Sequence, residues 1–186
     1  MNNHLYIGNQ DLFAVRLAWK PATHPSHLPV VYAHLVIGGR VIGNPAESCF
    51  LPGWSAAIEY FKRAINDHFD QLYHPNFAGL NDREIFDMIW EAYPDRSQTN
   101  PIYNAIHLDE TTDSYLMVMV AHGKSSLKFI WKCWQEPCES LGKLFTIVVE
   151  RNFVLDTLEN TLIRLQYEPY RSAWPSRGRQ AKRPNE

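Results

Sequence analysis

One stretch of the chain, residues 113–134, constrains the fold more than any other. Its sequence, DSYLMVMVAHGKSSLKFIWKCW, contains two apolar runs, 115–121 and 127–134, separated by the polar segment 122–126. Apolar runs of this length that are bounded by turn residues are typical of β-strands. The stretch therefore predicts a hairpin of two apolar strands, and it carries no catalytic or metal-binding motif.

The first third of the chain predicts an antiparallel meander. In residues 12–19 the large apolar side chains alternate with an arginine and two alanines, as in a half-buried strand. Residues 30–37 form a second apolar run, which ends at Gly38-Gly39. Two glycines suit a type I′ turn, because both of its central residues need a positive φ. Residues 40–43 then return as a short third strand.

Three amphipathic segments predict helices. The first follows a Pro-Gly pair, and Ser55 is its expected N-cap. The second has Asn81 at the N-cap and Glu84 three residues later, which is the capping-box arrangement. The third spans about 152–166, where apolar residues recur at helical spacing.

Two further strands, at 104–108 and 144–149, complete the predicted order β-β-β-α-α-β-β-β-β-α. This order predicts an α+β fold, in which an antiparallel sheet (the meander plus the C-terminal hairpin) packs with about three helices. Alternating βα units with glycine-rich phosphate turns are missing from the sequence, which argues against a Rossmann or P-loop protein.

The chain length and the charge distribution predict one domain with a tail. A chain of 186 residues fits one domain, which we place at 1–168, followed by a basic, disordered tail at 169–186. Residues 170–186 hold five basic residues and one acid, which leaves 13 basic and 19 acidic residues in 1–169. An acidic body disfavours nucleic acid and favours a basic partner, although the charge also serves solubility. The role of the tail stays open, as does that of the proline-rich loop at 20–29.

The cysteines and the chain's hydropathy indicate a cytoplasmic protein. Cys49, Cys133 and Cys138 are odd in number and irregularly spaced, so they predict reduced thiols rather than a disulfide framework. We expect Cys133 and Cys138 to pack as small apolar groups. The first 20 residues contain no secretory signal, and the longest apolar run, 115–121, is too short to span a bilayer.

No catalytic residue, metal site or cofactor is predicted. His24 and His27 lie in a proline-rich loop without further ligands nearby in the sequence, whereas a metal site needs three or four. A nucleophile requires a base and an orienting group, and no such motif is present. A Cys49–His34 pair stays open as a nucleophile and its base.

The acids Asp109, Glu110 and Asp113 cluster in the segment that leads into the predicted hairpin. Paired carboxylates can perform acid–base chemistry. A solvated turn is the simplest interpretation, because Thr111 and Thr112 lie between them in a polar connection. The remaining interpretation is an acidic recognition surface for a basic partner, and these three residues are the predicted partner-binding residues.

Three segments resemble a known family. They are FAVRLAW…VVYAHLVIGGRVIG, the segment HLDETTDSYLMVMVAHGKSSLKFIWKCW, and LFTIVVERNFVLDTLENTL, a strand that runs into the last helix. With these segments the chain resembles the immunity proteins of bacterial polymorphic toxin systems, and most closely the immunity protein 42 family. The resemblance implies a small cytoplasmic antidote in interbacterial competition that binds a cognate toxin and blocks it. It assigns a role to no individual residue.

The combined expectation is a non-enzymatic immunity protein that neutralises a cognate, basic toxin by occlusion, without nucleic acid or membrane partners. Two alternatives remain: a small hydrolase or transferase with an unrecognised site, and an adaptor of a secretion system. A deep pocket with converging histidine, cysteine and carboxylate groups would favour the enzyme. The toxin's activity and the oligomeric state stay open.

Overall fold

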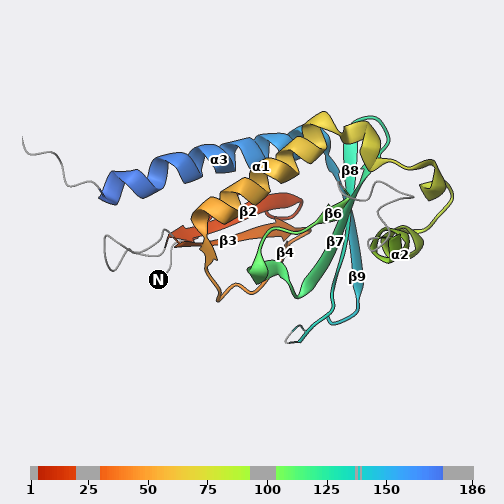
Figure 1. The fold of residues 1–186 in the computed structure, drawn as a ribbon, viewed down its shortest axis with the longest axis horizontal. Helices are drawn as coiled ribbons and strands as arrows, with labels where there is room; N and C mark the ends of the chain where they lie inside the picture. The colour runs from red at the N-terminus through yellow and green to blue at the C-terminus, as the bar shows by residue number, and fades with distance from the viewer. Residues whose placement is uncertain (1–3, 20–29, 93–103, 137, 139, 174–186) are drawn as a thin grey trace, which may run out of the picture.

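Two antiparallel sheets form the framework of the molecule (Figure 1). The computed structural model describes residues 4–19, 30–92, 104–136, 138 and 140–173. The first sheet has the order β1-β2-β3-β4, with β5 also paired to β3; its strands are β1 Leu5–Asn9, β2 Phe13–Trp19, β3 Val30–Ile37, β4 Arg40–Val41 and β5 Cys49–Phe50. The second has the order β6-β7-β8-β9; its strands are β6 Ala105–Ile106, β7 Tyr115–His122, β8 Ser126–Cys133 and β9 Leu144–Glu150.

The predicted hairpin is β7 and β8, which pair from Tyr115 with Cys133 to His122 with Ser126. Met117 and Met119 face the main core, whereas Val118 and Val120 belong to a second apolar cluster on the opposite face of the sheet. Because both faces of β7 are covered, its sequence is a continuous apolar run rather than an alternating one.

Within the described residues, three α-helices cover the sheets: α1 Leu51–Asp67, α2 Asp82–Ala92 and α3 Arg151–Ala173. Helices α1 and α3 lie side by side along the first sheet, and α2 lies against the second sheet at the other end of the molecule (Figure 1). Short 3₁₀ turns occur at η1 Phe69–Leu72, η2 Pro75–Phe77 and η4 Glu110–Thr112. The predicted α+β class is therefore confirmed, and the strands form two sheets.

The main core joins both sheets to α1 and α3. At its centre the rings of Phe13 from β2 and Phe129 from β8 stack with centroids 5.5 Å apart, and Phe61 from α1 lies 6.3 Å from each. Each of these rings is at most 4% exposed. Because the three rings come from both sheets and a helix, they fix how the layers pack together.

Helix α2 is attached to the outer face of the second sheet by a smaller cluster, which includes Phe86 and Ile89. The helix begins with the predicted capping box. The backbone N–H of Glu84 donates to Asn81 Oδ1 at 3.1 Å, and the backbone N–H of Asn81 donates to Glu84 Oε2 at 2.8 Å. An ion pair of 2.7 Å between Lys128 of β8 and Asp82 adds a polar contact.

The predicted Gly38-Gly39 turn is confirmed, with φ values of 56° and 75°. The start of α1 was predicted wrongly, because the helix begins at Leu51 and Ser55 donates to the Leu51 carbonyl at 2.8 Å instead of capping. A proline in the first turn of a helix loses no hydrogen bond, so the Pro-Gly pair begins α1 rather than preceding it.

Strand β1 was not predicted, and α3 continues to Ala173, beyond the predicted domain boundary at 168. The proline-rich loop at 20–29 and residues 174–186 of the tail lie outside the described residues. Among the helices that the structure describes, none combines the length and apolar character that crossing a membrane requires.

Candidate functional site

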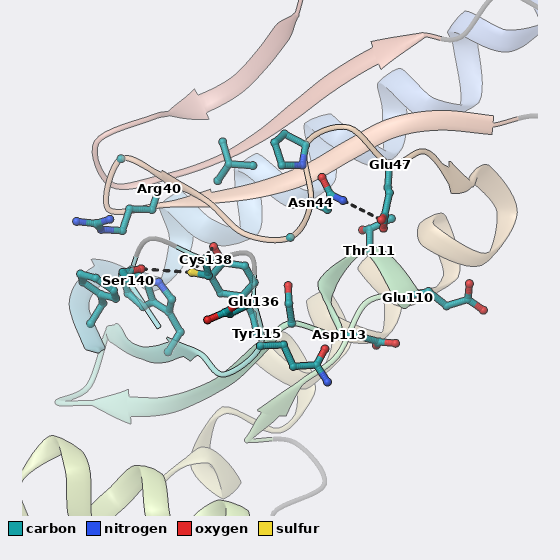
Figure 2. Close-up of a pocket in the computed structure, with 18 residues that line it drawn as sticks. Arg40, Asn44, Glu47, Glu110, Thr111, Asp113, Tyr115, Glu136, Cys138 and Ser140 are labelled. Atoms are coloured by element: carbon teal, nitrogen blue, oxygen red, sulfur yellow. Dashed lines mark hydrogen bonds between the residues drawn. The ribbon is translucent and has the colours of Figure 1, made fainter. Parts of the chain in front are cut away.

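The acidic segment before β7 is a turn that is held by side-chain hydrogen bonds. Asp109 is extended and precedes η4; its carboxylate accepts from the Thr111 hydroxyl at 2.7 Å, and its carbonyl accepts from the Thr112 hydroxyl at 2.8 Å. Both threonines are buried. The carboxylates of Glu110 and Asp113 are exposed, and Figure 2 shows Glu110 extending away from the turn. The three predicted acids therefore lie together on a turn that buried threonines hold in place.

A second segment docks on this turn from the first sheet. The Asn44 N–H donates to the Thr111 carbonyl at 3.0 Å, and the Asn44 side chain donates to Glu47 at 2.8 Å. Gly43 has a φ of 99°, and a Cβ there would lie 2.6 Å from the Thr111 carbonyl oxygen. Because only glycine permits this approach, the contact brings the Glu47 carboxylate beside the acids of the turn.

Among the described residues, two cavities border the turn. The first, of ≈ 550 Å³, lies between the β3–β4 turn, the start of β7 and the β8–β9 connection (Figure 2); we call it the acidic groove. Four carboxylates line it: Glu47, Glu110, Asp113 and Glu136. Arg40 is the one basic residue among its described lining residues. The second cavity, of ≈ 740 Å³, is lined by Asp109 and again by Glu47 and Glu110.

Trp134 is exposed beside the acidic groove. Its indole Nε1 donates to the Asp113 carbonyl at 2.7 Å, and its backbone N–H donates to the Ser114 carbonyl at 3.0 Å. The side chain is nevertheless 46% exposed. An indole whose polar atom is already bonded presents a fixed apolar ring to solvent. We refer to Glu47, Asp109, Glu110, Asp113, Glu136 and Trp134 together as the acidic face.

The pair Cys49 and His34, left open from the sequence, is not assembled as a nucleophile and its base. Cys49 Sγ donates to the Val31 carbonyl at 3.2 Å, and burial together with the Asp109 carboxylate raises the pKa of Cys49 to about 12. His34 Nε2 instead lies 2.9 Å from the Asn44 carbonyl oxygen, which accepts from it. In the described ranges, no three histidine, cysteine or carboxylate side chains gather closely enough to hold a metal ion.

Comparison with known proteins identifies the family. The immunity protein 42 family matches residues 4–178 of the chain. The chain belongs to the immunity protein 42 family. Its fold is similar to that of the CdiI crystal structure from Burkholderia dolosa AUO158, with a TM-score of 0.60 and 13% identity, over 86% of this chain and 99% of that one. No curated protein matches the chain.

Membership of the immunity protein 42 family confirms the predicted resemblance and the predicted toxin-neutralising function. It implies a cognate toxin as partner and favours binding over catalysis. The sequence-based prediction grouped the acids of the turn because they are neighbours in the chain, and their role in binding stays a prediction. It did not include Glu47, Glu136 and Trp134, which only tertiary contacts bring near these acids.

Proposed function

We propose that this immunity protein neutralises its toxin by occlusion, without catalysis, and that the acidic face binds a basic surface of the toxin. The observation that carries the proposal is that five carboxylates from three segments of the chain line two adjoining cavities, and that the exposed Trp134 is held by the carbonyl of one of these residues, Asp113. Like charges on one face cost stability, so their accumulation is better explained by a basic partner than by solubility.

Charge and shape have different roles in this proposal. The exposed carboxylates attract a basic toxin over a distance and accelerate association, by about 10- to 1,000-fold at low salt. Trp134 then provides the apolar contact, since tryptophan is enriched among the residues that dominate binding energy. Because its ring is already held by Asp113, binding loses little side-chain entropy.

The enzyme alternative is less well supported. A hydrolase with Cys138 or Ser140 as nucleophile needs an adjacent base. Among the described residues that line the acidic groove there is no histidine. The second cavity is lined by His107 and Cys49, but the Cys49 thiol donates to the Val31 carbonyl and its raised pKa disfavours a nucleophilic thiolate. We therefore propose that the groove is a contact surface for one basic protein partner. We also propose that the protein is cytoplasmic and binds neither nucleic acid nor a membrane.

Charge reversal tests the proposal. In the variant E110K/D113K/E136K the acidic face becomes basic, while Asp109 is kept because it holds Thr111. We expect the association rate with the toxin domain encoded beside the gene to fall about 100-fold at low salt. Surface plasmon resonance over a salt series measures this rate.

The control for this experiment is D67K/D70K/D156K, which makes the same change in net charge on exposed positions of α1, η1 and α3. It should bind the toxin nearly as well as the wild type. Equal affinity and equal salt dependence of the wild type and E110K/D113K/E136K would remove the acidic face as the binding site.

A further inference from the structure

The three cysteines occupy different surroundings, although all are free thiols. Cys49 and Cys133 are buried, whereas Cys138 is partly exposed and lines the acidic groove. Cys138 is therefore the thiol that a small solute reaches from solvent through the groove.

Two hydroxyl groups surround the Cys138 sulfur. Ser140 Oγ lies 3.5 Å from Cys138 Sγ and Tyr115 Oη lies 3.8 Å from it. Figure 2 shows the three residues side by side, with the Ser140–Cys138 contact drawn as a dashed line. Burial and the neighbouring Cys138 raise the pKa of Tyr115, so its phenol keeps its proton. Both hydroxyls can thus donate hydrogen bonds to a thiolate at Cys138.

The backbone brings Cys138 back to Cys133. The Leu141 N–H donates to the Cys138 carbonyl at 3.1 Å, and Leu141 forms an isolated β-bridge with Cys133. The Gly142 N–H donates to the Cys133 carbonyl at 2.8 Å, which secures the same turn. Tyr115, whose hydroxyl contacts Cys138, is the cross-strand partner of Cys133. The Cys133 thiol donates to the Gln135 carbonyl at 3.2 Å, and it lies near enough to Cys138 for each thiol to shift the pKa of the other.

The two thiols differ in acidity. Burial by itself raises the pKa of Cys138, but hydrogen bonds from Cys133, Ser140 and Tyr115 outweigh it, and the net pKa lies below the ordinary value. Burial, and the hydrogen bond to Cys138, raise the pKa of Cys133 to about 11. An accessible thiol of lowered pKa beside a buried thiol of raised pKa is the arrangement of an oxidation-sensitive cysteine and its resolving partner.

We propose that Cys138 and Cys133 form an oxidation site for hydroperoxides. The Cys138 thiolate attacks a peroxide oxygen, the O–O bond breaks, and the departing oxygen takes up a proton as water or an alcohol. Cys138 is then a sulfenic acid. The Cys133 sulfur attacks the Cys138 sulfur, the S–O bond breaks, and water leaves with the Cys133 proton. Two thiols are oxidised to one disulfide, and one hydroperoxide is reduced.

The location of the pair links it to toxin binding, and this link rests on the proposed function. Cys138 shares the acidic groove with Glu110, Asp113 and Glu136. A toxin that covers the groove would therefore shield Cys138 from peroxide.

The test treats the full-length protein with hydrogen peroxide and counts free thiols while peptide mapping locates the product. Of the three thiols, we expect two to disappear in the wild type, with a disulfide joining Cys133 to Cys138 and Cys49 unchanged. C49S should form the same disulfide at the wild-type rate. C138S should lose no thiol in that time, and C133S should accumulate a sulfenic acid that dimedone traps at Cys138.

Because Cys133 is fully buried, C133A serves as a second variant, with circular dichroism as the check on folding. Oxidation of Cys49 as fast as Cys138, or thiol loss in C138S at the wild-type rate, would overturn the oxidation site. The reaction is repeated with toxin bound, where we expect at least about tenfold slower oxidation. If the disulfide forms equally fast in a verified toxin complex, the oxidation site stands and the proposed binding face fails.

Discussion

The β7–β8 hairpin and the acidic turn that leads into it are adjacent in the chain but differ in almost every physical property. Met117, Met119 and Phe129 of the hairpin are at most 1% exposed, whereas Glu110 and Asp113 of the turn are exposed. The hairpin is buried on both faces, so substitutions there should change stability. The turn is held by buried threonines and displays its charges, so substitutions of its exposed acids should change binding and leave stability nearly intact.

The largest effect should come from the hairpin. In F129A the centre of the aromatic cluster with Phe13 and Phe61 is lost, and we expect a loss of about 3–5 kcal/mol in the free energy of unfolding. Urea denaturation measures it. The matched variant F129L keeps most of the volume and should lose less than about 1.5 kcal/mol. A small loss in F129A would mean that the packing of the two sheets does not depend on this cluster.

The second effect should separate binding from stability. W134A removes the exposed ring of the acidic face, and we expect toxin affinity to fall by about 2 kcal/mol or more, roughly 30-fold. The free energy of unfolding should fall by only about 1 kcal/mol, for the lost hydrogen bond to Asp113. Isothermal titration and urea denaturation of the same samples measure the two quantities.

The control for W134A is W134F, which keeps an aromatic ring but cannot donate to the Asp113 carbonyl. It should retain more affinity than W134A if the ring itself makes the contact. A variant W134A that loses stability but no affinity would assign Trp134 to the framework and contradict the division between hairpin and turn.

The difference between these regions also explains what could be predicted from the sequence. The β7–β8 hairpin, the Gly38-Gly39 turn and the capping box at Asn81 each depend on residues a few positions apart, and all were predicted. Strand β1 was missed, because Leu5–Asn9 is a partly exposed edge strand that contains Gly8. Its pairing with β2 is visible only in three dimensions.

The candidate site, like the fold, could be predicted only where its residues are close in sequence. Asp109, Glu110 and Asp113 are close in sequence, so their clustering is evident from the amino-acid order alone. Glu47 reaches them only because the glycine at position 43 lets the chain approach Thr111. Glu136 reaches the groove from the connection between β8 and β9. Neither approach produces a local sequence signal, so the acidic face could be predicted only in part.

The smallest effect should come from His34, the buried histidine that connects the framework to the acidic turn through Asn44. Burial above all, together with the nearby charges of Arg16 and His4, lowers the pKa of His34, although its bond to Asn44 and the Asp109 carboxylate oppose this. A histidine with a lowered pKa in the folded state binds its proton more readily when unfolded. Its contribution to stability is therefore present above about pH 6.5, the unfolded value, and is lost as the pH falls below it.

The substitution H34Q should remove this pH dependence, because a glutamine amide can still donate to the Asn44 carbonyl but does not titrate. We expect the wild type to lose more stability than H34Q between pH 7 and pH 5, as measured by urea denaturation at each pH. H122Q, at an exposed position of β7, should follow the wild type. Parallel curves of unfolding free energy against pH for the wild type and H34Q would show that the folded protein tolerates a charged His34. The acidic turn would then depend less on the hairpin framework than its hydrogen bonds indicate.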